Sequence, residues 1–193
     1  GQMTDVSHFW LSIHLLTALV TLALLVWTAL DLRALAREPG ARPSRFGVFA
    51  LLVSAILFLQ LLLGAWVAGL NAGHASYDWP LMQGRFVPEF DTARGWLWAL
   101  THDPYLLHFL HRWWAWIAVI VLIWLARRVR TDSRTASIAI HSTFGTQIIL
   151  GIATVLSGVS LWIAVAHQLM GALLVAATAW GLHVNGRQAK REL

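Results

Sequence analysis

The sequence contains no cysteine among its 193 residues, and only 12% of them are charged. The absence of cysteine excludes disulfides, thiolate metal sites, iron–sulfur clusters and covalently attached c-type haem. A soluble domain carries about 25% charged residues, so this low charge, with 58% hydrophobic content and a mean hydropathy of +0.64, identifies a membrane protein. The formal net charge of +5 comes from basic residues scattered between apolar stretches, which excludes a nucleic-acid binder.

Long uncharged stretches define the predicted fold class. They cover 6–30, 46–77, 113–126 and 135–186. Lipid offers the backbone no hydrogen-bond partners, so each stretch must be helical, and about 20 residues suffice for one crossing. The last stretch is long enough for two crossings, and its one cluster of turn formers, 157–160, is the predicted break. The sequence therefore predicts an all-α, polytopic membrane bundle of five transmembrane helices, at approximately 8–31, 46–70, 105–127, 136–157 and 161–183.

Basic residues indicate the orientation of these helices. Cytoplasmic loops are enriched in Lys and Arg. Of the 14 basic residues, 11 fall on one predicted side: Arg33, Arg37, Arg42, Arg45, Arg127, Arg128, Arg130, Arg134, Arg187, Lys190 and Arg191. We expect that side, with loops 32–45 and 127–135 and the C-terminus, to be cytoplasmic. The long loop 71–104 and the N-terminus of the chain are then expected outside.

Three histidines are predicted to lie at one depth in the outer leaflet. His14, His111 and His167 follow the outer ends of their helices by eight or nine residues, which is about 12 to 14 Å at helical rise. Ionisable groups inside a membrane usually mark function. Imidazoles without cysteine or clustered carboxylates suit haem iron held between two histidines better than zinc. The alternative is that each histidine is buried and bonded to a neighbouring carbonyl or hydroxyl.

The other histidines are expected to have lesser roles. His108, one turn from His111, is placed to contact the edge of a cofactor but is not predicted as a ligand. The remaining five are expected to be solvated or interfacial: His8, His74, His102, His141 and His183. Most of the 12 tryptophans are interpreted as an interfacial belt. A wall around a flat aromatic ligand is the alternative for Trp113, Trp114 and Trp116.

Weak internal repetition suggests a packed, duplicated bundle. A Gln and a Gly recur one turn apart as Gln60 and Gly64 and again as Gln147 and Gly151, a pattern that also suits ordinary close helix packing. The first and fifth spans each carry a tryptophan thirteen residues beyond their histidine. This repeat predicts three further helices before residue 1, and the first residues, without Met or a signal peptide, agree with a piece of a longer chain.

Four motifs resemble those of a known family. Residues 64–73 (GAWVAGLNAG) and 79–88 (WPLMQGRFVP) resemble the outer-loop signature of the haem A synthase family. Residues 109–112 (FLHR) and 166–168 (AHQ) resemble its two later histidine motifs, and 12–15 (SIHL) is similar to the motif on the fourth of its eight helices. The absence of cysteine is similar to the cysteine-free proteobacterial type. The resemblance covers nearly the whole chain.

The resemblance implies an enzyme of two four-helix halves that oxidises a ring methyl of haem O to the formyl group of haem A. It implies that His111 and His167 bind haem b in the second half and that His14 belongs to a substrate haem site in the first half. The catalytic residues are then expected on helices that this sequence lacks. Arg112 is suited to pairing with a haem propionate, with Arg85 a weaker candidate, while interfacial snorkelling is the alternative for Arg112.

The expected organisation follows from these implications. Residues 1–45 are expected to form the last helix of an otherwise absent N-terminal half plus a cytoplasmic linker. Residues 46–193 are expected to form a four-helix haem b domain with periplasmic loop 71–104. The expected location is the bacterial inner membrane, and the expected partners are the lipid bilayer, the missing N-terminal half, haem O synthase and cytochrome oxidase assembly factors. A diheme b-type cytochrome that only transfers electrons is the alternative function, and a transporter or structural bundle without haem is a third.

Overall fold

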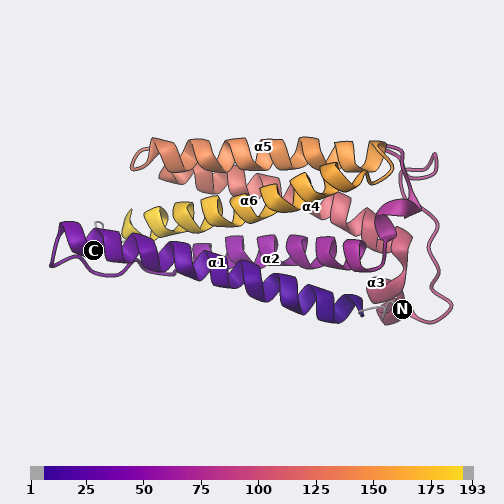
Figure 1. The fold of residues 1–193 in the computed structure, drawn as a ribbon, viewed down its shortest axis with the longest axis horizontal. Helices are drawn as coiled ribbons and strands as arrows, with labels where there is room; N and C mark the ends of the chain where they lie inside the picture. Colours follow the sequence, from indigo (N-terminus) through magenta and orange to yellow (C-terminus); the bar gives the residue numbers. More distant parts are fainter. Residues whose placement is uncertain (1–6, 189–193) are drawn as a thin grey trace.

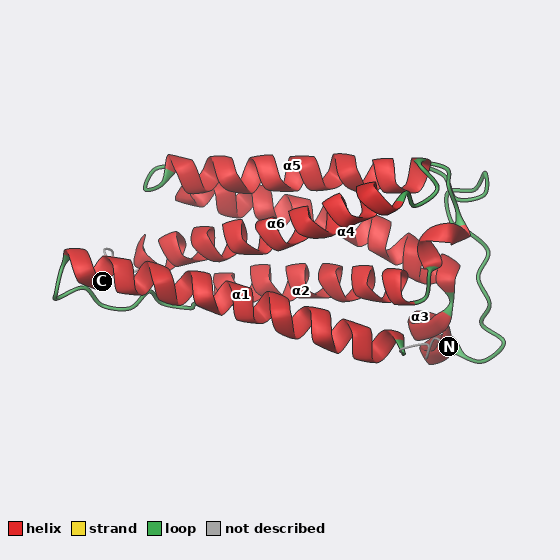
Figure 2. Ribbon diagram, viewed as in Figure 1, coloured by secondary structure: helices red, strands yellow, loops and turns green. Residues whose placement is uncertain are grey.

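The computed structural model describes residues 7–188, which are helical apart from loops and turns (Figures 1 and 2). The elements are α1 (His8–Arg37), α2 (Val48–Gly69), the 3-10 helix η1 (Ala72–Ala75), α3 (Trp96–His102), α4 (Pro104–Val129), α5 (Arg134–Leu156) and α6 (Leu161–Gln188). Five of them, α1, α2, α4, α5 and α6, are long and apolar enough to cross a membrane. This confirms the predicted all-α bundle of five spans. Gly1–Asp5, Lys190 and Arg191, used in the predictions above, lie outside the described residues.

Polar residues at the predicted boundaries start and end the helices. Asp103 caps α4, its carboxylate accepting from the Leu106 N–H at 2.8 Å, and Pro104 follows at the first helical position. Ser133 caps α5 in the same way at 3.2 Å. The predicted break between α5 and α6 is also confirmed, because Gly158 and Val159 turn the chain there with φ of 66° and 62°.

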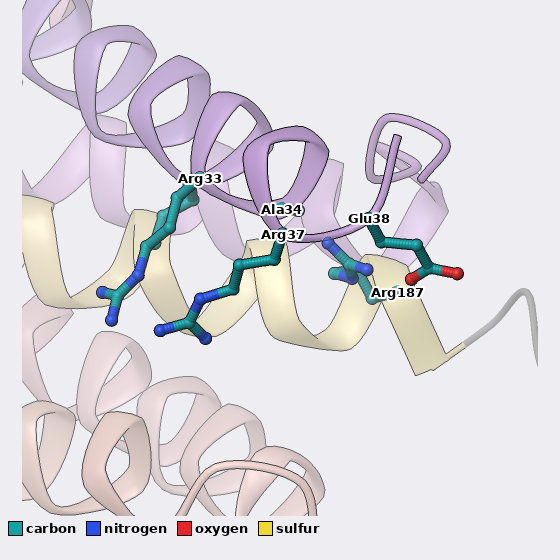
Figure 3. Close-up of a pocket in the computed structure, with 6 residues that line it drawn as sticks. Arg33, Ala34, Arg37, Glu38 and Arg187 are labelled. Carbon is teal, nitrogen blue, oxygen red and sulfur yellow. The ribbon is translucent and has the colours of Figure 1, made fainter. Parts of the chain in front are cut away.

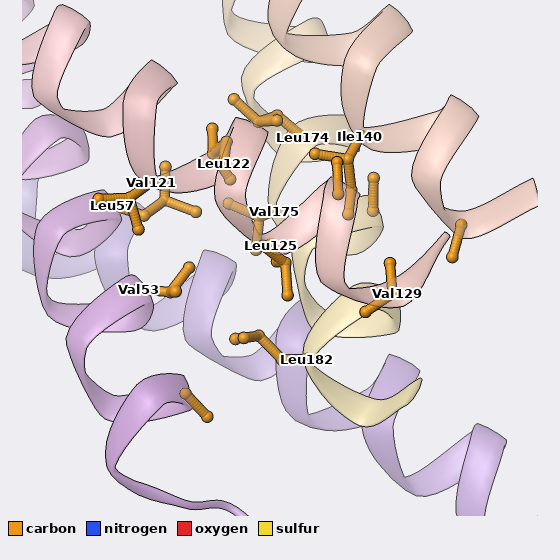
Figure 4. Packing of buried hydrophobic residues seen from close by; sticks show 14 residues of the cluster. Val53, Leu57, Val121, Leu122, Leu125, Val129, Ile140, Leu174, Val175 and Leu182 are labelled. Atoms are coloured by element: carbon orange, nitrogen blue, oxygen red, sulfur yellow. The ribbon is translucent and has the colours of Figure 1, made fainter. Parts of the chain in front are cut away.

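The apolar core fills one half of the bundle. Its buried side chains come from 50–57 of α2, 121–129 of α4, 136–140 of α5 and 174–182 of α6 (Figure 4). This half lies toward the short α4–α5 connection, and the long loop between α2 and α4 lies at the opposite end (Figure 1). α1 packs against both α2 and α6. The other half of the bundle, toward the long loop, lies outside this core cluster.

A polar network joins α1, the α1–α2 connection and α6 at the core end. The His183 ring lies 2.9 Å from the Asp31 carboxylate, which also accepts from the Ser44 N–H at 2.9 Å. The Ser44 hydroxyl donates to the His183 carbonyl at 2.7 Å. The expectation of a solvated His183 is therefore wrong, because this side chain is buried against Trp27 and bonded to Asp31.

The opposite end is built around the contact of α1 with α2. His8 is buried, also against expectation, because it packs beside Gly69, where a Cβ atom would lie 2.7 Å from the His8 Cβ. One turn along α1, the Ser12 hydroxyl accepts from the Trp66 indole N–H at 3.2 Å. These contacts fix the register of the two antiparallel helices.

Candidate functional site

A polar layer lies beyond the apolar core. Along α5, Gln147 follows the last core residue, Ile140, by seven residues, and along the antiparallel α6, His167 precedes the first core residue, Leu174, by seven, about 10 Å at helical rise in each case. Gln60 of α2 and His111 of α4 contact each other at the corresponding end. Four membrane-spanning helices thus each contribute one polar side chain to the half of the bundle that the core does not fill.

His111 lies between an amide and a glycine of α2. The Gln60 amide nitrogen is 3.1 Å from His111 Nδ1 and donates to the His111 carbonyl at 3.2 Å. One turn further along α2, a Cβ atom on Gly64 would lie 2.9 Å from His111 Cε1. That distance is closer than real Cβ contacts come, so only glycine accommodates the imidazole there.

His167 has the same environment on α5. The Gln147 amide nitrogen is 3.4 Å from His167 Nε2, and a Cβ atom on Gly151 would lie 3.1 Å from His167 Cε1. Gly171, one turn from His167, faces the Gln147 amide. The Gln and Gly that recur in the sequence therefore face the two predicted ligands, one pair each.

The two histidines converge inside the bundle. α4 packs against α6, and the imidazoles of His111 and His167 lie within electrostatic range of each other. His167 Nδ1 is buried with no hydrogen-bond partner among residues 7–188. In the described part of the chain, no group of three or more His, Cys, Asp or Glu side chains has the geometry of a metal site. Two imidazoles fit haem iron, which takes four ligands from its porphyrin, better than they fit zinc.

His14 shares the depth of these histidines but not their surroundings. From the contact of His8 with Gly69, His14 lies six residues down α1 and Gly64 five residues down α2, both about 8 to 9 Å from that contact. The His14 side chain is exposed on the outside of the bundle. The structure therefore brings together His111 and His167 and leaves His14 apart.

Arg112 holds the outer loop from below. Its guanidinium is buried, with 6% of the residue exposed, and donates to the carbonyls of Ser76, Asp78 and Leu81 at 2.9 to 3.2 Å. Its Nε donates to His108 at 3.0 Å. Arg112 therefore does not snorkel toward water. Its pairing with a propionate stays a prediction, and Arg85, exposed and paired with Glu89, stays the weaker candidate.

Asp78 organises the predicted signature segment 79–88. The Ser76 hydroxyl and the backbone N–H groups of Gly84 and Gln83 donate to its carboxylate, and these bonds hold the pKa of Asp78 well below its ordinary value. Asp78 was not among the predicted site residues. An aspartate placed shortly before a Gln-Gly turn was the signal that pointed to this role.

The aromatic residues of α4 have separate environments. Trp113 packs on Phe86 of the loop with ring centroids 4.6 Å apart, and the Trp114 indole N–H donates to the Ile56 carbonyl at 3.0 Å. Trp116 is 41% exposed. These three tryptophans do not share one wall.

A hollow at the core end of the bundle carries a different chemistry. It is lined by Leu30, Arg33, Ala34, Arg37, Glu38 and Arg187, from the last turns of α1 and α6 (Figure 3). α1 enters at the end that holds His8 and leaves at this one, so the hollow and the histidine pair lie in opposite halves of the bundle. It is not part of the candidate site.

Comparisons with known proteins show which proteins the chain is similar to. The chain is 70% identical over 191 residues to "Heme A synthase" of Erythrobacter litoralis, covering 99% of this chain and 57% of the relative. It is 57% identical to "Heme A synthase" of Sphingopyxis alaskensis over 96% of this chain and 53% of the relative. The chain thus spans about half the length of the curated relatives it matches. No solved structure matches it significantly.

A family model described as "Cytochrome oxidase assembly protein" matches residues 1–179. The match covers α2, α4 and α5 completely and α6 up to residue 179, so it includes every residue of the polar layer. The chain is a multi-pass membrane protein that belongs to the COX15-CtaA family of cytochrome oxidase assembly proteins.

Proposed function

We propose that this chain carries the haem b half of a haem A synthase, an enzyme that oxidises a methyl group of haem O to the formyl group of haem A. The observation that carries the proposal is the convergence of His111 and His167 in a polar layer of an otherwise apolar bundle. The names of the similar proteins support the same activity.

His111 and His167 are the residues proposed to hold one low-spin haem b. Held by two histidines, that group would supply electron transfer and not oxygen activation. The apolar core lies on one side of the pair and the Arg112-held loop on the other. His14, exposed on α1, is proposed for a separate haem O site.

The proposed setting is the bacterial inner membrane, with loop 71–104 on the periplasmic side. The bilayer, haem O synthase and other cytochrome oxidase assembly factors are the proposed partners. The excess of basic residues at the other end of the bundle supports this orientation.

The test is the absorption spectrum and the extracted haem of the purified chain. We expect protohaem with a sharp low-spin α band on reduction, and loss of that band in His111→Ala and in His167→Ala. His141→Ala is the matched control, because His141 is exposed and bonds only to the Ser137 carbonyl of its own helix. A full low-spin spectrum in both variants, or no haem in the wild-type chain, overturns the proposal.

A further inference from the structure

Two glutamines lie against the two predicted ligands, Gln60 at Nδ1 of His111 and Gln147 at Nε2 of His167. Gln60 and Gln147 lie on different helices, yet each has its amide at a ring nitrogen of one histidine, with a glycine one turn further that the same ring fills. Helix packing explains the glycines. It does not explain why an amide stands beside each ring.

A buried amide in a membrane helix is costly. Moving an amide into an apolar environment without full hydrogen bonding is strongly unfavourable. The Oε1 atoms of both Gln60 and Gln147 are buried without a hydrogen-bond partner in the range 7–188. Leucine fills the positions around Gln60 at 59, 61, 62 and 63, so an apolar residue suits this stretch of α2. Both glutamines are therefore present despite the unfavourable burial of their amides, and both amides face a histidine ring.

We propose that Gln60 and Gln147 are positioning residues, each of which fixes the orientation and the second ring nitrogen of one iron-binding histidine; this rests on the proposed function. Gln60 reaches both the ring and the carbonyl of His111, so it ties the imidazole plane to the backbone of α4. Gln147 meets the His167 ring alone, at the longer distance of 3.4 Å. Gly64 and Gly151, one turn further along the same helices, face Cε1 of each ring.

The proposed role predicts an electronic effect as well as a geometric one. A histidine that binds iron through one nitrogen carries a proton on the other, and a partner that accepts this proton makes the imidazole a stronger donor. In the structure the amide nitrogen of each glutamine faces the ring, and turning the amide about its last torsion brings its oxygen there instead, where it accepts the ring proton. For Gln60 that turn gives up the bond to the His111 carbonyl. A stronger donor favours ferric over ferrous iron. Loss of the amide should raise the reduction potential, and a carboxylate in its place should lower it.

The experiment compares Gln60→Leu, Gln147→Leu and Gln60→Glu in the purified, full chain. Gln168→Leu is the matched control, since Gln168 adjoins His167 but is exposed. The readouts are the midpoint potential, the electron paramagnetic resonance of the ferric form and the rate of haem transfer to apomyoglobin. We expect roughly 10- to 100-fold weaker haem retention in the Leu variants, the range typical for removal of such partners. The potential should rise in Gln60→Leu and fall in Gln60→Glu, and Gln168→Leu should match wild type.

The outcomes separate this inference from the proposed function. Unchanged potential and resonance in Gln60→Glu overturn the inference, even if the Leu variants fail to fold. Shifts of the midpoint potential in the same direction in Gln60→Leu and Gln60→Glu also overturn it, because a purely structural role does not predict opposite shifts. If the wild-type chain shows a bis-histidine haem while these variants leave it unaltered, the proposed function stands without the inference. A wild-type chain with no low-spin haem removes the basis of both.

Discussion

Arg112 is the residue that links the outer loop to the histidine layer. It adjoins His111 in sequence, yet it points to the loop, where its donors meet three backbone carbonyls. A guanidinium is suited to this task because its planar fork holds several donors in fixed directions, which a lysine ammonium does not. The loop is therefore attached to the same turn of α4 that carries a predicted iron ligand.

Arg112→Ala should loosen the loop. Removing the guanidinium leaves the carbonyls of Ser76, Asp78 and Leu81 without this donor, and the bond to Ser76 is buried. A buried group left unsatisfied costs about 1 to 3 kcal/mol, so we expect a lower melting temperature and faster proteolysis of loop 71–104. Arg112→Lys should restore only part of the loss. Glu89→Ala is the control, because it removes an exposed ion pair on the same loop that is worth about 1 kcal/mol or less. Equal melting of Arg112→Ala and wild type contradicts this role.

The helices could be predicted from the sequence, but the side-chain contacts that hold them together could not. Uncharged length gave all five spans, and the turn formers gave the break at 157–160, because both signals are local. His183 was predicted solvated because its partners, Asp31 and Ser44, lie 152 and 139 residues away in the chain. The short helices η1 and α3 were also missed, since a loop with charges and glycines carries no long apolar signal.

The candidate site, too, was predictable only in part. The common depth of His111 and His167 was predictable because counting residues along a helix gives depth without knowledge of packing. Their role as ligands stays a prediction. The recurring glutamines were noticed, but their contacts with the histidine rings depend on how α2 packs on α4 and α5 on α6. The partners of Arg112 were not predictable, because a backbone carbonyl carries no residue identity.

Gly186→Ala tests how the connection between α1 and α2 packs against α6. A Cβ atom there would collide with the carbonyl oxygen of Arg45 and the hydroxyl of Ser44, and backbone does not yield as a flexible side chain does. We expect about 1 to 3 kcal/mol of destabilisation from this overpacking, read as a lower melting temperature. Gly40→Ala on the same connection is the control, since nothing lies within 4 Å of its Cβ position. If both variants melt alike, the connection does not hold α6 as the structure shows.

At the scale of the whole molecule, the two ends of the bundle differ in charge and in content. Arginines of α1 and α6 line the hollow at the core end (Figure 3), and the α4–α5 connection at that end is basic as well. The other end carries the structured loop and, below it, the polar layer. A membrane potential and the insertion machinery act on this asymmetry of Lys and Arg, so it sets which end enters the cytoplasm. The proposed haem b then lies nearer the periplasmic surface.

Labelling of single cysteines in intact cells decides this orientation without background, because the chain has no cysteine of its own. Thr92→Cys lies exposed in the long loop, and Thr131→Cys lies exposed between α4 and α5. We expect a membrane-impermeant maleimide to modify the cysteine at 92 and to spare the one at 131 until the cells are opened. The reverse pattern would place the histidine layer in the cytoplasmic leaflet, and would contradict the periplasmic loop while leaving the pairing of His111 with His167 intact.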